Sequence, residues 1–174
     1  MRAEDVEQGL RKADVCRREI KAINAKAKCN TVGRDVLSKA AWSRLLDCDL
    51  IVAVTDNHTS RMLLNTLSQQ FLIPQVSVGS LIELDGGNLR TAGGHIRVVL
   101  PGTGHHCLIC SKIIDPTEVY YERTPPARRR EAVRRGYIAN FNEPAPAVVH
   151  LNGVLANAAL VEIHNLYCGF KEIC

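Results

Sequence analysis

The sequence contains no apolar stretch that approaches the roughly 20 residues a membrane span needs. Its first residues are charged, where a secretory signal peptide would become apolar. The seven cysteines are an odd, scattered set with one close pair, Cys107 and Cys110, so a secreted disulfide framework is disfavoured. We therefore expect a cytoplasmic protein that does not interact with a membrane.

The chain also has little net charge, and a formal charge of +4 over 174 residues is too small to imply a nucleic-acid partner. The charge is unevenly spread, because six arginines fall between Arg123 and Arg135. Such a cluster can attract an acidic partner or phosphates. The alternative is a solvated helix face, which is favoured because no aromatic platform or groove-reading motif accompanies the cluster.

Phosphate-binding glycine loops are missing as well. Neither G-x-G-x-x-G after a strand nor a Walker-type G-x-x-x-x-G-K occurs in the sequence. For a nucleotide-binding enzyme this absence is a serious objection. No Ser/His/Asp or Cys/His triad can be argued either, since spatial proximity cannot be derived from one chain.

What the sequence does contain is typical of a globular protein, with 46% hydrophobic and 23% charged residues, and we expect one domain over residues 1–174. Apolar spacing predicts an amphipathic helix over 6–23, with Lys12 in its middle. The apolar run 50–54 predicts a buried strand, 59–71 a helix and 75–78 the next strand. Alternation of this kind predicts a parallel sheet in an α/β fold.

The pattern changes in the second half of the chain. Seven glycines between 79 and 104 predict an antiparallel hairpin or meander added to the parallel sheet. The proline-rich stretch 115–145 predicts a crossover segment rather than a packed layer. The nearly uncharged run 148–167 predicts a long C-terminal helix that is buried against the sheet or a second subunit.

The most informative stretch is Thr55–Arg61, which directly follows the predicted strand 50–54. It places Asp56 at the carboxyl end of a parallel strand, where open α/β sheets bind their ligands. Asp56 can therefore hold a cation or a ligand hydroxyl. The alternative is that Asp56 only caps the helix that begins near His58, since Asp is a favoured cap.

The spacing of Cys107 and Cys110 lets both thiolates reach one tetrahedral zinc ion. This pair is half of a structural site, which needs four ligands. A redox pair and two unliganded thiols remain as alternatives. The candidates for the other two zinc ligands are His105, His106, Cys168 and Cys174.

Several segments of the chain, taken in their order along the sequence, resemble the ThiF/MoeB/HesA family, the bacterial relatives of ubiquitin-activating enzymes. The resemblance covers almost the whole chain, and its specific part is a strand followed by D-N-x-x-x-R and, later, by C-x-x-C. The matching segments are 5–6, 12–15, 47–57 with Ser60, Arg61 and Asn65, 72–74, 98–102, 107–110, and 146–149 with Leu151, Asn152 and Ala156.

The resemblance implies a partial Rossmann-like, doubly wound sheet and an ATP-dependent enzyme. Members of the family activate the C-terminal carboxylate of a ubiquitin-like or sulfur-carrier protein as an acyl-adenylate, and they form homodimers. By this resemblance Asp56 would hold Mg²⁺ beside the phosphates of ATP, and Lys12 would neutralise charge on them. Arg61 is the weaker candidate for contact with ATP, and packing or pairing near its helix is the favoured role. Cys107 and Cys110 match the first pair of the family's Zn²⁺ site.

The sequence departs from the family pattern at both ends. The strand, glycine-rich turn, ribose-binding acid and Asn/Arg segment expected before residue 1 are absent, and so is a second C-x-x-C. We therefore expect the middle and C-terminal part of a ThiF-type domain, which alone does not bind ATP. In this part, 1–78 is the α/β region, 79–114 the hairpin with the C-x-x-C, 115–145 the crossover and 146–174 the buried helix.

No cysteine lies between Ser111 and Ala145, so a thioester or persulfide step has no nucleophile there. Two other functions remain open. One is a non-catalytic scaffold that dimerises or docks a carrier tail. The other is a relative that adenylates a ribosomal peptide at its C-terminus.

Overall fold

The computed structural model describes residues 2–86, 88–136 and 148–172. These residues form two compact units, which divide after Leu45. Each unit is described by itself below. That both belong to one domain stays a prediction.

The first unit contains three helices, α1 (Ala3–Glu7), α2 (Lys12–Ile23) and α3 (Lys39–Leu45). The single helix predicted over 6–23 is wrong, because the chain breaks between α1 and α2. The break contains Gly9, whose φ of 61° lies in the left-handed region that glycine adopts without strain. Lys12 is therefore the first residue of a helix and not a mid-helix residue.

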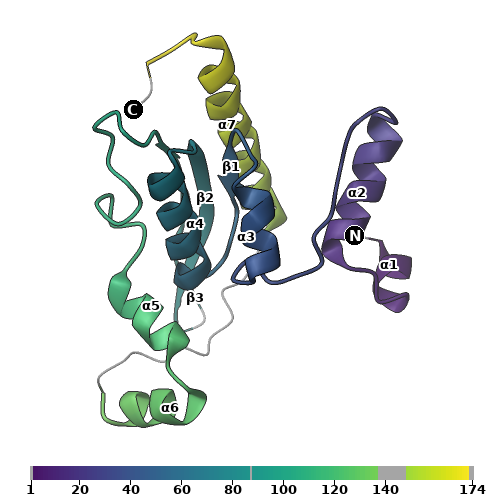
Figure 1. The fold of residues 1–174 in the computed structure, drawn as a ribbon. Helices are drawn as coiled ribbons and strands as arrows, with labels where there is room; N and C mark the ends of the chain where they lie inside the picture. Colours follow the sequence, from purple (N-terminus) through teal and green to yellow (C-terminus); the bar gives the residue numbers. More distant parts are fainter. Residues whose placement is uncertain (1, 87, 137–147, 173–174) are drawn as a thin grey trace. The chain divides into compact units, whose positions relative to one another are not determined.

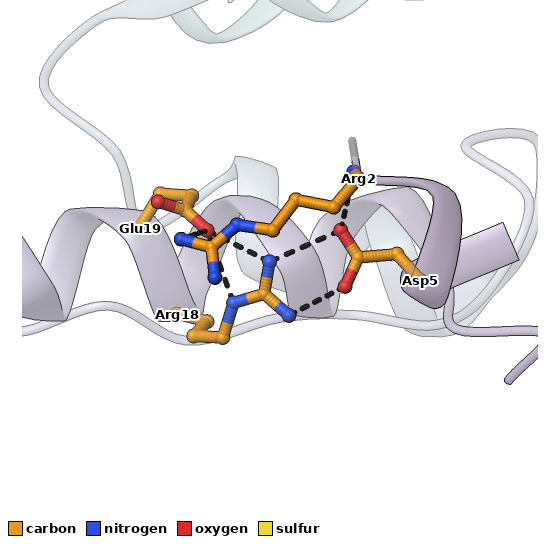
Figure 2. A network of polar contacts seen from close by, with 4 residues as sticks. All are labelled: Arg2, Asp5, Arg18 and Glu19. Atoms are coloured by element: carbon orange, nitrogen blue, oxygen red, sulfur yellow. Dashed lines mark hydrogen bonds and ion pairs between the residues drawn. The ribbon is translucent and has the colours of Figure 1, made fainter.

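A buried carboxylate connects α1 to α2 (Figure 2). Asp5 is 2% exposed, and it accepts hydrogen bonds from the backbone N–H of Arg2 at 2.7 Å and from the Arg18 guanidinium at 2.5 and 3.1 Å. Arg18 also contacts Glu19, which lies 3.5 Å from the Arg2 side chain. The hydrogen bond from Arg18 and that from the Arg2 backbone hold the pKa of Asp5 well below its usual range.

This network predicts that the first unit loses stability in acid. The folded pKa of Asp5 is lowered, so its contribution is present at neutral pH and is lost as the pH falls below about 4. We expect the unfolding midpoint of the native chain to fall more steeply between about pH 5 and pH 2 than that of Asp5→Asn. Thermal melts followed by circular dichroism would measure this.

The exposed acid Glu7, on the same helix, supplies the control. Glu7→Gln should keep the native pH dependence. If the native chain and Asp5→Asn showed parallel pH curves, this explanation of the network would be wrong.

The second unit is built on a sheet of three strands, β1 (Ile51–Ala53), β2 (Gln75–Asp85) and β3 (Asn88–Val99), in the order β1-β2-β3. β1 pairs with β2 in parallel, with Ile51 opposite Gln75. β2 and β3 form an antiparallel hairpin with Gln75 opposite Val99. The mixed sheet confirms the predicted α/β fold class, a partial Rossmann-like sheet followed by a hairpin.

Two helices, α4 (His58–Phe71) and α7 (Val149–Cys168), cover opposite faces of this sheet (Figure 1). Side chains alternate across a strand, so neighbouring residues of β3 contribute to different cores. Val98 packs with Val76, Val78 and Ala159 of α7. The other core contains Val99, Leu108 and Ile114, with Met62 of α4 against it.

The C-terminal helix is present as predicted, but only one of its faces is buried. Ala159 and Asn165 are its buried residues, whereas Val149, Val154 and Tyr167 are more than 65% exposed. An apolar helix with few charges can still leave one face open, because a three-stranded sheet covers only one side of it. Whether a second subunit covers the open face stays a prediction.

The predicted crossover segment is more regular than expected. It contains α5 (Pro116–Arg123) and α6 (Pro126–Arg134), each of which begins with a proline at its first position. Proline is favoured there because the first helical N–H needs no intrahelical partner. Residues 137–145, the rest of that segment, lie outside the described residues. Among the helices that the structure describes, none is long and apolar enough to cross a membrane.

Candidate functional site

Asp56 lies in the turn between the end of β1 and the start of α4. The cap of α4 is the neighbouring residue Asn57, whose Oδ1 accepts a hydrogen bond from the backbone N–H of Ser60 at 2.7 Å. The alternative in which Asp56 caps the helix is therefore wrong. Asp56 is exposed, and its Oδ1 accepts a long hydrogen bond of 3.3 Å from the Asn57 amide. Its carboxylate remains open to a ligand.

A second carboxylate, from Glu122 of α5, holds the first turn of α4. It accepts hydrogen bonds from the backbone N–H of His58 at 2.8 Å and of Thr59 at 2.7 Å, and from the Thr59 hydroxyl at 2.5 Å. In addition, the backbone N–H of Asp115 donates to Nδ1 of His58 at 3.2 Å. Because free N–H groups at a helix start favour negative charge, Glu122 is well placed there. These contacts fix the turn that presents Asp56.

Arg61 lies one turn into α4 and is partly buried. Burial lowers its pKa, and the negative charges of Asp56 and Glu122 oppose that shift. A Cβ atom added at Gly79 would lie 2.5 Å from Cε1 of His95 and 2.8 Å from Nη2 of Arg61, so both side chains pack closely over this glycine of β2. The prediction that Arg61 packs near its helix agrees with this placement, although its role stays a prediction.

Beside Arg61, a histidine on β3 shares the same partly buried region. Burial, and then the positive charge of Arg61, lower the pKa of His95. Its Nε2 lies 3.3 Å from the hydroxyl of Ser77, a buried residue of β2. A neutral His95 is therefore the favoured state at neutral pH, and the positive charge at this end of the sheet comes from Arg61.

Cys107 and Cys110 lie in one turn, and their Sγ atoms are 3.7 Å apart. A tetrahedral zinc ion with Zn–S bonds of about 2.3 Å would separate two sulfurs by roughly 3.8 Å. Although burial opposes the shift, hydrogen bonds from the backbone of Cys110 and Ile109 lower the pKa of Cys107. The pair therefore fits two ligands of a zinc ion.

The described residues do not complete that site. In residues 2–86, 88–136 and 148–172, no three His, Cys, Asp or Glu side chains cluster in a way that could hold a metal. Cys168 ends α7 as an exposed residue, and Cys174 lies outside the described residues. Within the described residues, Asn65 of α4 holds the cysteine turn in place, because its Oδ1 accepts a hydrogen bond from the backbone N–H of Leu108 at 3.0 Å.

Comparison with known proteins identifies the group to which this arrangement belongs. The model of the ThiF family matches residues 1–173. The chain belongs to the ThiF family. No curated protein matches the chain significantly.

A solved structure, the selenomethionine form of PaaA, is similar with a TM-score of 0.57 and 15% sequence identity. The match covers 99% of this chain and 51% of that one, so the chain spans about half the length of PaaA. At this identity the similarity shows a shared fold and nothing finer.

A ThiF-type site implies Mg²⁺ and ATP, and the geometry at Asp56 fits a Mg²⁺ ligand. Mg²⁺ in proteins usually takes one or two carboxylates together with phosphate oxygens and water. Asp56 offers one exposed carboxylate at the carboxyl end of β1, with Arg61 as a nearby positive charge. The bound ion would supply positive charge beside the phosphates.

Lys12 belongs to the first unit and Asp56 to the second, so a meeting of the two side chains stays a prediction. Lys12 is exposed at the first position of α2. Glu122, by contrast, was not predicted as part of the site. It lies 63 residues after Thr59 in sequence, and no motif connects the two.

Proposed function

We propose that the chain is part of an ATP-dependent adenylyltransferase that activates the C-terminal carboxylate of a ubiquitin-like or sulfur-carrier protein. The observation that carries the proposal is the open carboxylate of Asp56 in a ThiF-family chain, on a turn whose helix is capped by Asn57 and held by Glu122. If Asp56 had only a structural role, its carboxylate would cap α4. The cap is Asn57 instead, so the Asp56 carboxylate is available for a ligand.

In this reaction a carboxylate oxygen of the carrier attacks the α-phosphorus of ATP, and pyrophosphate leaves with the electron pair of the broken P–O bond. The product is an acyl-adenylate. Asp56 holds the cation that offsets charge on the phosphates, and Lys12 contributes a second positive charge. Arg61 packs beside Gly79 and supplies positive charge near Asp56.

The remaining parts of the proposal concern metal, assembly and location. Cys107 and Cys110 supply two of the four ligands of a structural Zn²⁺, and the described residues do not complete this site. The exposed apolar face of α7 meets a second copy in a homodimer. The protein acts in the cytoplasm.

A peptide-adenylating enzyme and a non-catalytic scaffold are the alternatives. Both retain the family fold, and the first also retains the chemistry at Asp56. Pyrophosphate exchange into ATP separates them, because a scaffold gives none. Exchange with a ribosomal peptide, and not with a carrier protein, would identify the peptide-adenylating relative.

The test of the proposal uses the protein that contains this chain, ATP, labelled pyrophosphate and a carrier with a free C-terminus. Exchange should depend on Mg²⁺ and on the carrier. The matched control is the same carrier with an amidated C-terminus, which lacks the attacking carboxylate and should support no exchange. Equal exchange with both carriers, or none with either, would contradict the proposal.

A further inference from the structure

The arginine cluster predicted from the sequence lies on two short helices that contribute little to the core. No residue of α5 or α6 is buried. Residues 123–135 contain six arginines and one glutamate, so they carry more positive charge than the +4 of the whole chain. Adjacent like charges on a helix repel one another. Packing does not explain why these arginines are placed together.

Three of the six arginines have internal roles. Glu131 accepts a hydrogen bond from Arg135 at 2.6 Å and also pairs with Arg134, so its charge is already shared. Arg129 donates hydrogen bonds to the carbonyl oxygens of Glu122 at 2.6 Å and Thr124 at 3.2 Å. Arg129 thereby fixes α6 to the end of α5.

The other three, Arg123, Arg128 and Arg130, are exposed. Within the described part of the chain, their side chains form no ion pair or hydrogen bond. A guanidinium group binds a carboxylate through two parallel hydrogen bonds, which makes an exposed arginine group a good receptor for acidic side chains. These three residues are called the arginine surface below.

Hydrogen bonds connect the helix of the arginine surface to the candidate site. Arg129 holds α6 to the backbone of Glu122, and the side chain of Glu122 holds the first turn of α4. That turn begins two residues after Asp56. A partner bound to the arginine surface is therefore held on a helix that is connected by hydrogen bonds to the turn that presents Asp56.

We propose that the arginine surface docks an acidic segment of a polypeptide partner. The inference rests on the proposed function for the identity of that partner, which is the carrier or peptide whose carboxylate is activated. A polypeptide is favoured over nucleic acid because the proposed function acts on a polypeptide. In addition, α6, which carries Arg128 and Arg130, has no aromatic residue on which bases could stack, and the exposed Tyr120 lies on α5. Opposite charge then guides the partner to the site and sets its orientation.

The experiment measures binding of the full 174-residue chain to a fluorescein-labelled peptide of about ten glutamates, by fluorescence anisotropy at low salt without nucleotide. The test variant is Arg128→Glu with Arg130→Glu. The matched control is Arg17→Glu with Lys28→Glu, two exposed residues of the first unit whose reversal changes the net charge equally. A second variant, the neutral pair Arg128→Gln with Arg130→Gln, removes the two charges without reversing them. It tests the proposal if charge reversal disturbs α6.

The expected result is that the test variant weakens binding by about tenfold, the neutral pair by less, and the control pair by less than twofold. Absence of peptide binding by the native chain would overturn the proposal, as would equal losses in the test and control pairs. Tighter binding of a ten-nucleotide single strand than of the peptide would overturn it in favour of nucleic acid. Because no ATP is present, failure here is distinct from failure of pyrophosphate exchange.

Discussion

Replacing Asp56 by Asn should lower pyrophosphate exchange by about three orders of magnitude in the protein that contains this chain. Asn has nearly the same shape as Asp and keeps an oxygen that can accept from the Asn57 amide. The substitution therefore removes the charge that we propose holds Mg²⁺, and it should leave the turn intact. Exchange measured over a range of Mg²⁺ concentrations would show the loss, with partial recovery when Mg²⁺ is raised.

Asp49 supplies a matched control for this substitution. It is an exposed acid just before β1, at the opposite end of the strand from Asp56. Asp49→Asn should leave exchange within about twofold of the native rate, since exposed charges far from a site act weakly. Full activity of Asp56→Asn at low Mg²⁺ would show that Asp56 does not hold the ion.

Replacing Glu122 by Ala should destabilise the second unit by about 1–3 kcal/mol. The change removes the acceptor of the His58 and Thr59 backbone N–H groups and of the Thr59 hydroxyl. It also removes negative charge from the positive end of α4. Urea denaturation followed by circular dichroism measures the loss in free energy of unfolding.

Two further variants separate the hydrogen bonds from the other effects of this change. Glu122→Gln keeps one acceptor oxygen and should lose less stability than Glu122→Ala. Glu118→Ala shortens a side chain on the same helix, with no described contact to α4, and should change stability by less than about 0.5 kcal/mol. Equal stability of Glu122→Ala and Glu118→Ala would show that Glu122 does not hold the turn.

The sequence predicts the second unit well because its signals there are local. The apolar run 50–54 and the helical spacing of 59–71 identify β1 and α4, and the short connection to 75–78 fits a parallel pair. The position of Asp56 at the carboxyl end of β1 follows from this pattern alone. Residue types and spacing are sufficient when an element is defined by its own period.

The failures of prediction have physical reasons of two kinds. Gly9 breaks a pattern that otherwise continues, since one left-handed residue redirects the chain without changing the spacing of apolar side chains. The prolines of 115–145 predict a crossover segment rather than a packed layer, but Pro116 and Pro126 each begin a helix, α5 and α6. The contacts of Glu122 with His58 and Thr59, and of Asn65 with the cysteine turn, are long-range and depend on the folded chain.

The most direct test of the central claim follows the oxygen atoms of the carrier. A carrier whose C-terminal carboxylate carries ¹⁸O is incubated with the protein, Mg²⁺ and ATP, and hydroxylamine then releases the activated acyl group. If a carboxylate oxygen attacks the α-phosphorus, the released AMP contains one ¹⁸O atom by mass spectrometry. AMP without the label, or ¹⁸O in inorganic phosphate, would contradict adenylation of the carboxylate.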